Sequence, residues 1–382
     1  MSRRAARDEE RWWCALPALV AVLCGFGLMM VLSASSVQAL RAYGGPWVFF
    51  ERQLLWVAAG VAGLGLAARV DYRRWRVLAK PLVVLCLVLL AAVLVPSLGR
   101  SSGGSSRWLG VGALRFQPSE LAKLAALLFA ADLLARRTAR RGRDAVVVRP
   151  ALLATGALLL LILRQPDMGT AMVLFIVVLT VLFVGGVPLP RVAALTAAAT
   201  VASVLLSFAE SYRRARLFAF VDPWKDASNT GYQIAQSLVA LGSGHLTGVG
   251  LGASRAKWGF LPNAHTDFIF AIIGEELGLV GTLLVVALFA GFAVLGVRAA
   301  LAAPDRFGTL VAAGVTVWVV GQAVVNVGAV IGILPVTGVP LPFVSFGGSS
   351  LVICMVAVGI LVNIARQGAR AAPGRRAVTS AV

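Results

Sequence analysis

The chain has 382 residues, of which 59% are hydrophobic and only 13% charged, and its mean hydropathy is +0.88. Soluble globular proteins carry roughly 25% charged residues, so this composition excludes a water-exposed protein of this size, and it excludes intrinsic disorder for the same reason. The 35 Lys and Arg residues outnumber the 16 Asp and Glu residues and leave a net charge of +19. Such an excess is typical either of nucleic-acid binding or of a membrane protein with basic inner loops.

Apolar segments of about 20 residues, long enough to cross roughly 30 Å of hydrocarbon, recur along the whole chain. They predict an all-α integral membrane protein with about ten transmembrane helices, over residues 13–35, 49–68, 77–96, 118–135, 150–164, 168–187, 190–208, 267–297, 307–335 and 347–365. The first run is longer than the core of a signal peptide, so we interpret it as an uncleaved span. The predicted organisation is a cytoplasmic tail 1–12, a membrane domain 13–366 and a cytoplasmic tail 367–382.

The basic residues are distributed unevenly between the two predicted faces. With both termini in the cytoplasm, the inner face has 22 basic and 7 acidic residues, or +15, and the outer face has 13 basic and 9 acidic residues, or +4. The densest basic run, 136–143, has no aromatic residues between its arginines. The charge therefore indicates a positive-inside topology, with contacts to anionic membrane lipid, and no nucleic-acid partner.

Two predicted outer loops are long, whereas no inner loop is large enough to form a domain. The segment 209–266, between spans seven and eight, is polar and mixed, and the segment 97–117 is rich in Gly and Ser around Trp108. Loops of this length in a compact protein are usually functional, so we expect any chemistry at the outer face. The four cysteines lie in apolar runs without metal-ligand spacing, which predicts small buried side chains rather than disulfides or a zinc site.

Ionisable residues at membrane depth are costly and indicate function. Glu120 and Lys123 are three residues apart after the helix-starting Pro118, so they share one helix face. They form either a neutralised pair at a helix start or part of the wall of a polar cavity. Asp167 has the position of a helix N-cap, and this role is compatible with facing the same cavity.

The end of the long outer loop carries His265 and Asp267 and leads directly into span eight. On a helical wheel, Asp267 heads a strip of small residues within about 40° that leaves room for a neighbouring helix or for a substrate. The strip consists of Ala271, Gly274 and Gly278. Glu275 and Glu276 point to different sides of this helix, so we do not expect both to face one cavity. His265 alone is more typical of a polar loop residue than of a base.

The last outer loop, 335–350, contains three prolines and three glycines and predicts an irregular backbone at the membrane edge. The amides of Gly347, Gly348 and Ser349 at the start of span ten would suit an anion such as pyrophosphate, although a helix start needs no ligand.

Six motifs, in order along ten spans, resemble the SEDS family (shape, elongation, division, sporulation). They are Gly-Ser-Ser-Arg107-Trp108 with Phe116-Gln117-Pro118-Ser119-Glu120-Leu-Ala-Lys123, Gln165-Pro166-Asp167-Met-Gly169-Thr170, Asp222-Pro223-Trp224, Gly231-Tyr232-Gln233-Ile-Ala-Gln236-Ser237, His265-Thr266-Asp267-Phe-Ile-Phe-Ala and Pro340-Leu-Pro342-Phe-Val-Ser345-Phe-Gly347-Gly348-Ser349. The first span and Pro335-Val-Thr337-Gly338 are most similar to the division members.

The resemblance implies a peptidoglycan glycosyltransferase of the cytoplasmic membrane that polymerises lipid II at the outer face, at the septum in a division member. It implies that Asp267 is the catalytic base. Further residues are candidates for substrate binding: Arg107, Trp108, Gln117, Glu120, Lys123, Gln165, Asp167, Arg213, Arg214, Lys257, His265, Ser345 and Ser349. A divalent cation such as Mg²⁺ or Mn²⁺ is a candidate helper, and no organic cofactor is expected.

The family also implies a class B penicillin-binding protein and other divisome proteins as partners. The chain departs from the family pattern at Asn263, where many members have Glu, at Gly259, where some have an acid, and at Phe346, where Tyr is common. The alternatives to a division polymerase are an elongation-type polymerase, a lipid II flippase, and a scaffold whose transpeptidase partner performs the chemistry.

Overall fold

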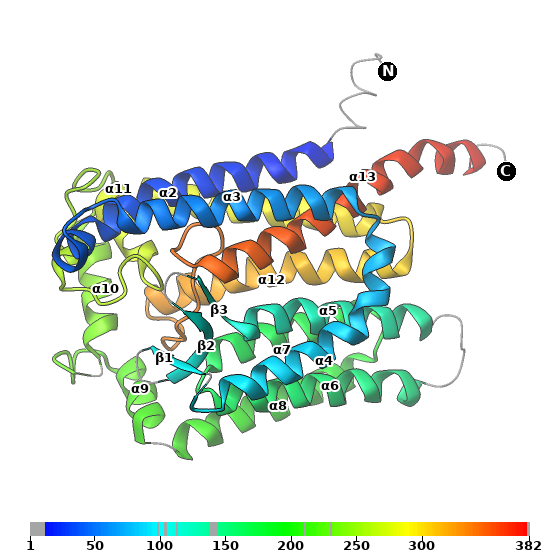
Figure 1. Ribbon diagram of the computed structural model, residues 1–382, viewed down its shortest axis with the longest axis horizontal. Helices are drawn as coiled ribbons and strands as arrows, with labels where there is room; N and C mark the ends of the chain where they lie inside the picture. The colour runs from blue at the N-terminus through cyan, green and yellow to red at the C-terminus, as the bar shows by residue number, and fades with distance from the viewer. Residues whose placement is uncertain are drawn as a thin grey trace, which may run out of the picture.

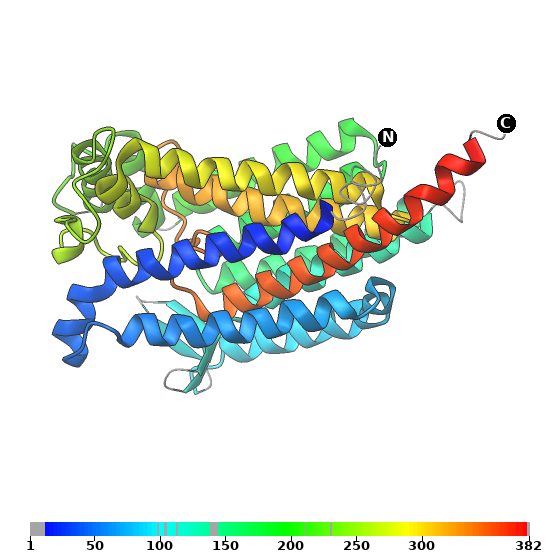
Figure 2. The same ribbon diagram turned by 90° about the horizontal axis from the view of Figure 1, so that it is seen from above.

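The structure, a computed structural model, describes residues 12–97, 99–102, 105–111, 114–137, 144–209, 211–229 and 231–379. In this part of the chain, ten helices of 17 residues or more form one bundle (Figures 1 and 2). They are α2 (Ala15–Tyr43), α3 (Val48–Arg69), α4 (Trp75–Val93), α5 (Pro118–Arg137), α6 (Asp144–Arg164), α7 (Met168–Val184), α8 (Leu189–Ala209), α11 (Ile269–Ala302), α12 (Arg306–Val330) and α13 (Gly348–Thr379). Each overlaps one of the predicted spans.

Six of the described helices are long and apolar enough to cross a membrane: Trp12–Tyr43, Tyr72–Val93, Leu189–Leu206, Ile269–Ala302, Arg306–Val330 and Gly348–Ala371. The protein is therefore a multi-pass membrane protein. The full count of ten spans and the orientation in the membrane stay predictions. Helix α8 buries none of its most apolar stretch, whereas α13 buries 78% of its own, so α13 lies in the centre of the bundle and α8 at its margin.

The two ends of the bundle differ. The start of α2 and the end of α13 lie at one end, here named the terminal end (Figure 1). The opposite end, named the loop end, carries the segment between α8 and α11. At the terminal end, Asp305 caps α12 through the amide of Gly308 and accepts hydrogen bonds from Tyr72 and Arg73, each at 2.8 Å. Two single-turn helices, η1 (Trp12–Cys14) and η2 (Tyr72–Arg74), also lie there.

The two long predicted loops contain regular secondary structure that was not predicted from their composition. The first forms a small antiparallel sheet in the order β1 (Arg100–Ser102), β2 (Ser105–Val111), β3 (Leu114–Phe116). The second contains α9 (Ser211–Val221), α10 (Tyr232–Ser243) and the turn η3 (Ala256–Trp258). The sheet leads directly into α5, and the second loop leads into α11.

Helix α11 is interrupted at Gly278, whose φ of 66° and ψ of −160° are not helical. The break is repaired from the loop that follows α10. The amide of Val249 donates to the carbonyl of Glu275 at 2.9 Å, and the amide of Leu279 donates to the carbonyl of His245 at 3.0 Å. Broken membrane helices need such partners because unpaired backbone groups are costly away from water. The first segment of α11 is thereby tied to the outer loop.

Helix α13 continues to Thr379, into the segment 367–382 predicted as a cytoplasmic tail. The expectation for the cysteines differs from the structure in one residue. Cys24, Cys86 and Cys354 are buried as expected, whereas Cys14 is exposed because it lies in the turn before α2 rather than inside the bundle.

Candidate active site

Asp167 is the centre of a polar cluster at the loop end of α5 and α7. As predicted, it caps α7, because its Oδ1 accepts the amide of Thr170 at 3.2 Å. Its Oδ2 accepts Gln117 Nε2 at 3.0 Å and Ser119 Oγ at 3.3 Å. Asp167 is only 2% exposed, so these donors supply hydrogen bonds to a carboxylate that is shielded from water.

Arg107 reaches this cluster from strand β2. Its guanidinium donates to the carbonyls of Gln165 and Pro166 and lies 3.9 Å from Asp167 Oδ1. The side chain of Gln165 is buried and donates to the carbonyl of Leu90 at 3.0 Å. The amide of Gln117 donates to Ser349 Oγ at the start of α13. The structure thus brings together five of the predicted residues from four separate segments: Arg107, Gln117, Gln165, Asp167 and Ser349.

Glu120 and Lys123 form the predicted pair one turn further into α5. Lys123 Nζ lies 2.9 Å from Glu120 Oε2, and both side chains are at most 3% exposed. The ammonium also donates to Gln322 Oε1 of α12 at 2.9 Å and lies 5.1 Å from the ring centroid of Trp318. Within the described residues, these contacts enclose the pair, as in the first of the two interpretations, a neutralised pair at a helix start.

Asp267 lies two residues before α11 and is partly exposed, unlike the residues of the buried clusters. Its carbonyl accepts Asn326 Nδ2 of α12 at 2.7 Å. Its carboxylate faces the last outer loop, because a methyl group added to Gly338 would lie 3.6 Å from Asp267 Oδ2. The φ of Gly338 is +71°, a conformation that suits glycine, so this close approach is built into the loop.

The last outer loop connects the Asp167 cluster with Asp267. A methyl group added to Gly169, at the start of α7, would overlap Thr337 and Val339 of this loop. The loop therefore lies against α7 on one side and against Asp267 on the other. The proposed anion site at the start of α13 is covered by α3, because the amide of Gly347 donates to Gln53 Oε1 at 3.4 Å and Gly348 lies against Trp56.

The strip of small residues below Asp267 accommodates a neighbouring helix. A methyl group added to Gly274 would clash with Leu241 of α10, and one added to Gly278 would clash with the backbone of Leu246 and Gly248. From the sequence, a neighbouring helix and a substrate are both possible occupants of this strip. In the structure, α10 and the segment after it occupy the strip.

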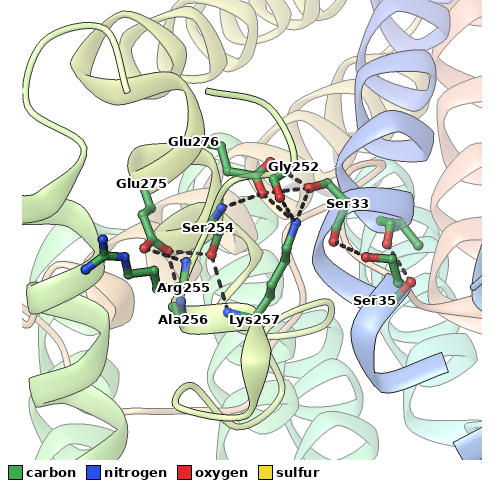
Figure 3. A network of polar contacts seen from close by, with 11 residues as sticks. Ser33, Ser35, Gly252, Ser254, Arg255, Ala256, Lys257, Glu275 and Glu276 are labelled. Atoms are coloured by element: carbon green, nitrogen blue, oxygen red, sulfur yellow. Dashed lines mark hydrogen bonds and ion pairs between the residues drawn. The ribbon is translucent and has the colours of Figure 1, made fainter. Parts of the chain in front are cut away.

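Lys257 is part of a buried network that joins the outer loop, α2 and α11 (Figure 3). Its Nζ lies 3.3 Å from Glu276 Oε1 and also donates to the carbonyl of Gly252 and to Ser33 Oγ. Ser33 Oγ donates in turn to Glu276 at 2.7 Å. Among the predicted cations, Lys257 is thus one whose charge is balanced inside the protein.

The two glutamates of α11 both contact the segment 254–257 of the outer loop, and neither faces an open cavity in these contacts. Glu275 accepts Ser254 Oγ and the amide of Arg255, whereas Glu276 accepts the amide of Ser254 (Figure 3). Helical geometry alone separates the two side chains by about 100°. Both carboxylates nevertheless contact one segment, because the outer loop passes the first part of α11.

The remaining candidates lie around these clusters. His265 is 7% exposed and packs between Phe49 and Phe346, and burial lowers its pKa to about 4. Ser345 Oγ accepts the amide of Leu341 at 2.8 Å. Trp108 is half-buried in β2, and Arg214 is exposed in α9. The Arg213 side chain lies outside the described part of the structure.

A resident metal site is not formed by the residues the structure describes, since none of their His, Cys, Asp and Glu side chains gather in groups of three or more. Mg²⁺ is often held by one or two carboxylates together with substrate phosphates. The participation of a divalent cation stays a prediction.

Sequence reasoning did not single out Gln322 and Asn326, which join the two clusters from α12. The available signal is that both are amides in an otherwise apolar helix, four residues apart and hence on one face. It also missed Ser33, because nothing in the sequence relates this residue to a lysine 224 positions away.

A family model described as "Cell cycle protein", for FtsW, RodA and SpoVE, matches residues 14–370. The chain belongs to the SEDS family. It is 44% identical over 373 residues to a Thioalkalivibrio sulfidiphilus protein named "Probable peptidoglycan glycosyltransferase FtsW", covering 97% of this chain and 93% of that one. It is 41% identical over 356 residues to the stage V sporulation protein E of Bacillus subtilis, covering 92% and 96%.

Solved structures of SEDS proteins share the fold. A chain of a peptidoglycan synthase complex that coordinates polymerization and crosslinking superposes with a TM-score of 0.75 and 31% identity, over 93% of this chain and 97% of that one. The rod shape determining protein RodA of Thermus thermophilus superposes with a TM-score of 0.68 and 30% identity, over 92% and 96%.

One departure of this SEDS chain has a local structural reason. Asn263 has a φ of +57°, a left-handed conformation that asparagine adopts more readily than most residues. Its carbonyl accepts the amides of Thr266 and Phe268, at 3.1 and 3.3 Å. Asn263 therefore forms the turn that leads to Asp267 and positions it before α11.

Proposed function

We propose that this SEDS protein is a peptidoglycan glycosyltransferase that polymerises lipid II into β-1,4 glycan strands in septal wall synthesis. The observation that carries the proposal is Asp267, a partly exposed carboxylate held at the loop end, in a chain whose relatives include proteins named FtsW. In the predicted orientation the loop end faces outward, where lipid II is presented. The protein then resides in the cytoplasmic membrane, at the division septum.

Asp267 acts as the general base. It takes the proton of the acceptor sugar's 4-hydroxyl while that oxygen attacks the anomeric carbon of the donor. The bond between this carbon and the diphosphate oxygen breaks, and undecaprenyl diphosphate leaves. Attack from the opposite face converts the α-linked donor into a β-1,4 linkage. A base needs access to the reacting hydroxyl, and Asp267 is partly exposed whereas Glu120, Asp167 and Glu276 are enclosed.

The leaving diphosphate requires positive charge, which favours Arg107 among the candidates. Arg107 is partly exposed, with 26% of its side chain accessible, and lies beside the Asp167 cluster. Lys123 and Lys257 are each enclosed and paired with a glutamate. Arg214 is exposed but lies in α9, for which no contact with these clusters supports a role.

The partner is expected to be a class B penicillin-binding protein. The support is the similarity to a chain of a peptidoglycan synthase complex. Other divisome proteins and anionic membrane lipids are further expected partners. Co-purification with the transpeptidase encoded in the same organism would test the first of these.

The decisive experiment is polymerisation of purified lipid II by the full chain and by Asp267→Asn. The amide keeps the shape of the side chain but removes the base, so we expect the rate to fall roughly 10²–10⁴-fold. Glu51→Gln is the matched control, because Glu51 is an exposed carboxylate at the same end of the bundle. Normal polymerisation by Asp267→Asn would refute the assignment of the base. Parallel reactions with EDTA and with added Mg²⁺ or Mn²⁺ would determine whether a divalent cation is required.

The flippase alternative predicts ionisable residues along a path through the bundle. The described ones instead gather towards the two ends, with Glu120 and Lys123 near the loop end and Asp132 paired with Arg76 and Arg136 nearer the terminal end. Among the described residues, no ion pair joins one group to the other. Transbilayer movement of lipid II in vesicles containing Asp267→Asn would separate transport from polymerisation. Complementation of division-depleted and elongation-depleted cells would separate the two polymerase roles.

A further inference from the structure

Helix α12 presents two buried amide side chains on one face towards the last outer loop. Gln322 and Asn326 are one turn apart and only 1% and 2% exposed. Gln322 Nε2 donates to the carbonyl of Pro340 at 2.9 Å, and Asn326 Nδ2 donates to the carbonyl of Val339 at 2.8 Å. Two consecutive carbonyls of an irregular loop are thus fixed by two amides of one rigid helix.

Each amide also contacts a second element of the candidate site. Gln322 Oε1 accepts Lys123 Nζ at 2.9 Å, and Asn326 Nδ2 donates to the carbonyl of Asp267 at 2.7 Å. Asp267 lies outside the helical hydrogen-bond ladder, because α11 begins only at Ile269. Asn326 therefore holds the Asp267 backbone and the neighbour of Gly338 at once.

Within the described residues, the Asn326 side chain acts only as a hydrogen-bond donor. Its Oδ1 is buried and accepts no hydrogen bond from the described residues, whereas Nδ2 serves two carbonyls. An unpaired buried acceptor is unfavourable. An apolar residue would avoid it, but would leave the carbonyls of Asp267 and Val339 without this donor. The arrangement suits a side chain whose task is to hold two carbonyl groups at a fixed separation.

We propose that Asn326 is a positioning residue for glycosyl transfer. By bridging the carbonyls of Asp267 and Val339, it fixes the position of the Asp267 carboxylate relative to the last outer loop. Gln322 connects the same loop to the Glu120–Lys123 pair through its hydrogen bonds to Pro340 and Lys123. Asn326 does not touch the reacting atoms and acts through Asp267. The inference rests on the proposed function.

The test compares steady-state kinetics of Asn326→Leu with those of wild type on purified lipid II. Leucine keeps the branched shape of the side chain but removes both hydrogen bonds, so the Asp267 segment can shift. Misplacement of a catalytic group by about 1 Å can cost roughly 10²-fold in rate, and we expect kcat to fall about 10–100-fold. The KM for lipid II should stay within about threefold, because the interaction lost concerns the transition state.

Ser237→Ala is the matched control for a purely structural effect. Ser237 is fully buried, and its Oγ donates to the carbonyl of Val330 at 2.7 Å. This hydrogen bond also connects to α12, but it involves neither Asp267 nor the last outer loop. Both variants should lower the melting temperature in detergent, because each removes hydrogen bonding to α12 or from it. Only Asn326→Leu should lower kcat. Asn326→Ser, which keeps one donor, is the second variant if the leucine protein does not insert, and its kcat should be reduced in the same direction.

Three outcomes would overturn the inference: an unchanged kcat for the Asn326 variant, a matching loss of kcat in Ser237→Ala, or a loss confined to KM. Failure of the proposed function is recognised separately, because then the wild type forms no glycan or Asp267→Asn remains active. If wild type polymerises, Asp267→Asn does not and Asn326→Leu is as fast as wild type, only the positioning role is refuted.

Discussion

Lys257 Nζ lies 3.3 Å from Glu276 Oε1, although Lys257 comes from the outer loop and Glu276 from α11, and their side chains are only 5% and 0% exposed. An ion pair buried this deeply holds two elements together only while both partners are present, because either charge alone is strongly unfavourable out of water. The pair therefore fastens the loop that leads to Asp267, and it does so at a distance from the Asp167 cluster.

Lys257→Met is expected to destabilise the protein strongly. It leaves the Glu276 carboxylate buried without its cation, and losing one partner of a buried pair costs about 3–5 kcal/mol. The double variant Lys257→Met/Glu276→Gln removes both charges and should recover much of the loss. Thermal unfolding in detergent measures both. A double variant no more stable than the single one would show that the pairing is not the source of the effect.

Stability should fall as the pH is lowered, partly through His265. Burial lowers the pKa of His265 from 6.5 to about 4, so the folded protein keeps this ring neutral while the unfolded chain binds a proton below pH 6.5. The unfolded state then binds more protons between these values, and stability present above pH 6.5 is lost towards pH 4. The loss at pH 5 relative to pH 8 is about 2 kcal/mol.

His265→Gln should remove this part of the pH dependence. Melting temperatures in detergent from pH 5 to pH 8 measure it as the difference between variant and wild type. His245→Asn is the control, because His245 is the only other histidine, is exposed, and has a left-handed φ of 46° that asparagine tolerates. Equal slopes for wild type and His265→Gln would contradict the burial argument.

The turn at Asn263 should depend on backbone conformation rather than on side-chain chemistry. Its φ of +57° suits glycine at least as well as asparagine, so Asn263→Gly should leave activity and stability nearly unchanged. A β-branched residue is unfavourable there, and Asn263→Val should cost about 1–2 kcal/mol and lower the polymerisation rate. Melting and lipid II assays on both variants test this. Equal behaviour of the two would mean that the turn relaxes without consequence.

The sequence predicted the helices well because membrane spans are long apolar runs, a signal local to each segment. The starts of α5 at Pro118 and of α7 after Asp167 were also predicted, since capping depends on a few adjacent residues. The break at Gly278 was not, because it depends on loop amides that reach α11 from elsewhere in the chain.

The candidate site was predicted only in part, because local sequence signals identify motif residues but not the tertiary contacts between them. Motif residues such as Gln117 and Asp167 lie together because each motif begins a helix at the same end of the bundle. The contacts that connect them depend on tertiary packing. Whether Lys257 is accessible or enclosed depends on Ser33 and Glu276, which only the fold brings to it.

Arg107 should contribute more to substrate affinity than the other arginines of the sheet formed by β1, β2 and β3. Its guanidinium is oriented by the carbonyls of Gln165 and Pro166 and stays partly exposed, so it can meet a diphosphate. Arg107→Gln should raise the KM for lipid II about tenfold, the equivalent of one charge-assisted contact. Arg115→Gln is the matched control, because Arg115 is an exposed arginine of the adjacent strand β3. If the two variants raise KM equally, the sheet contributes only a diffuse positive field, and the contact assigned to Arg107 is wrong.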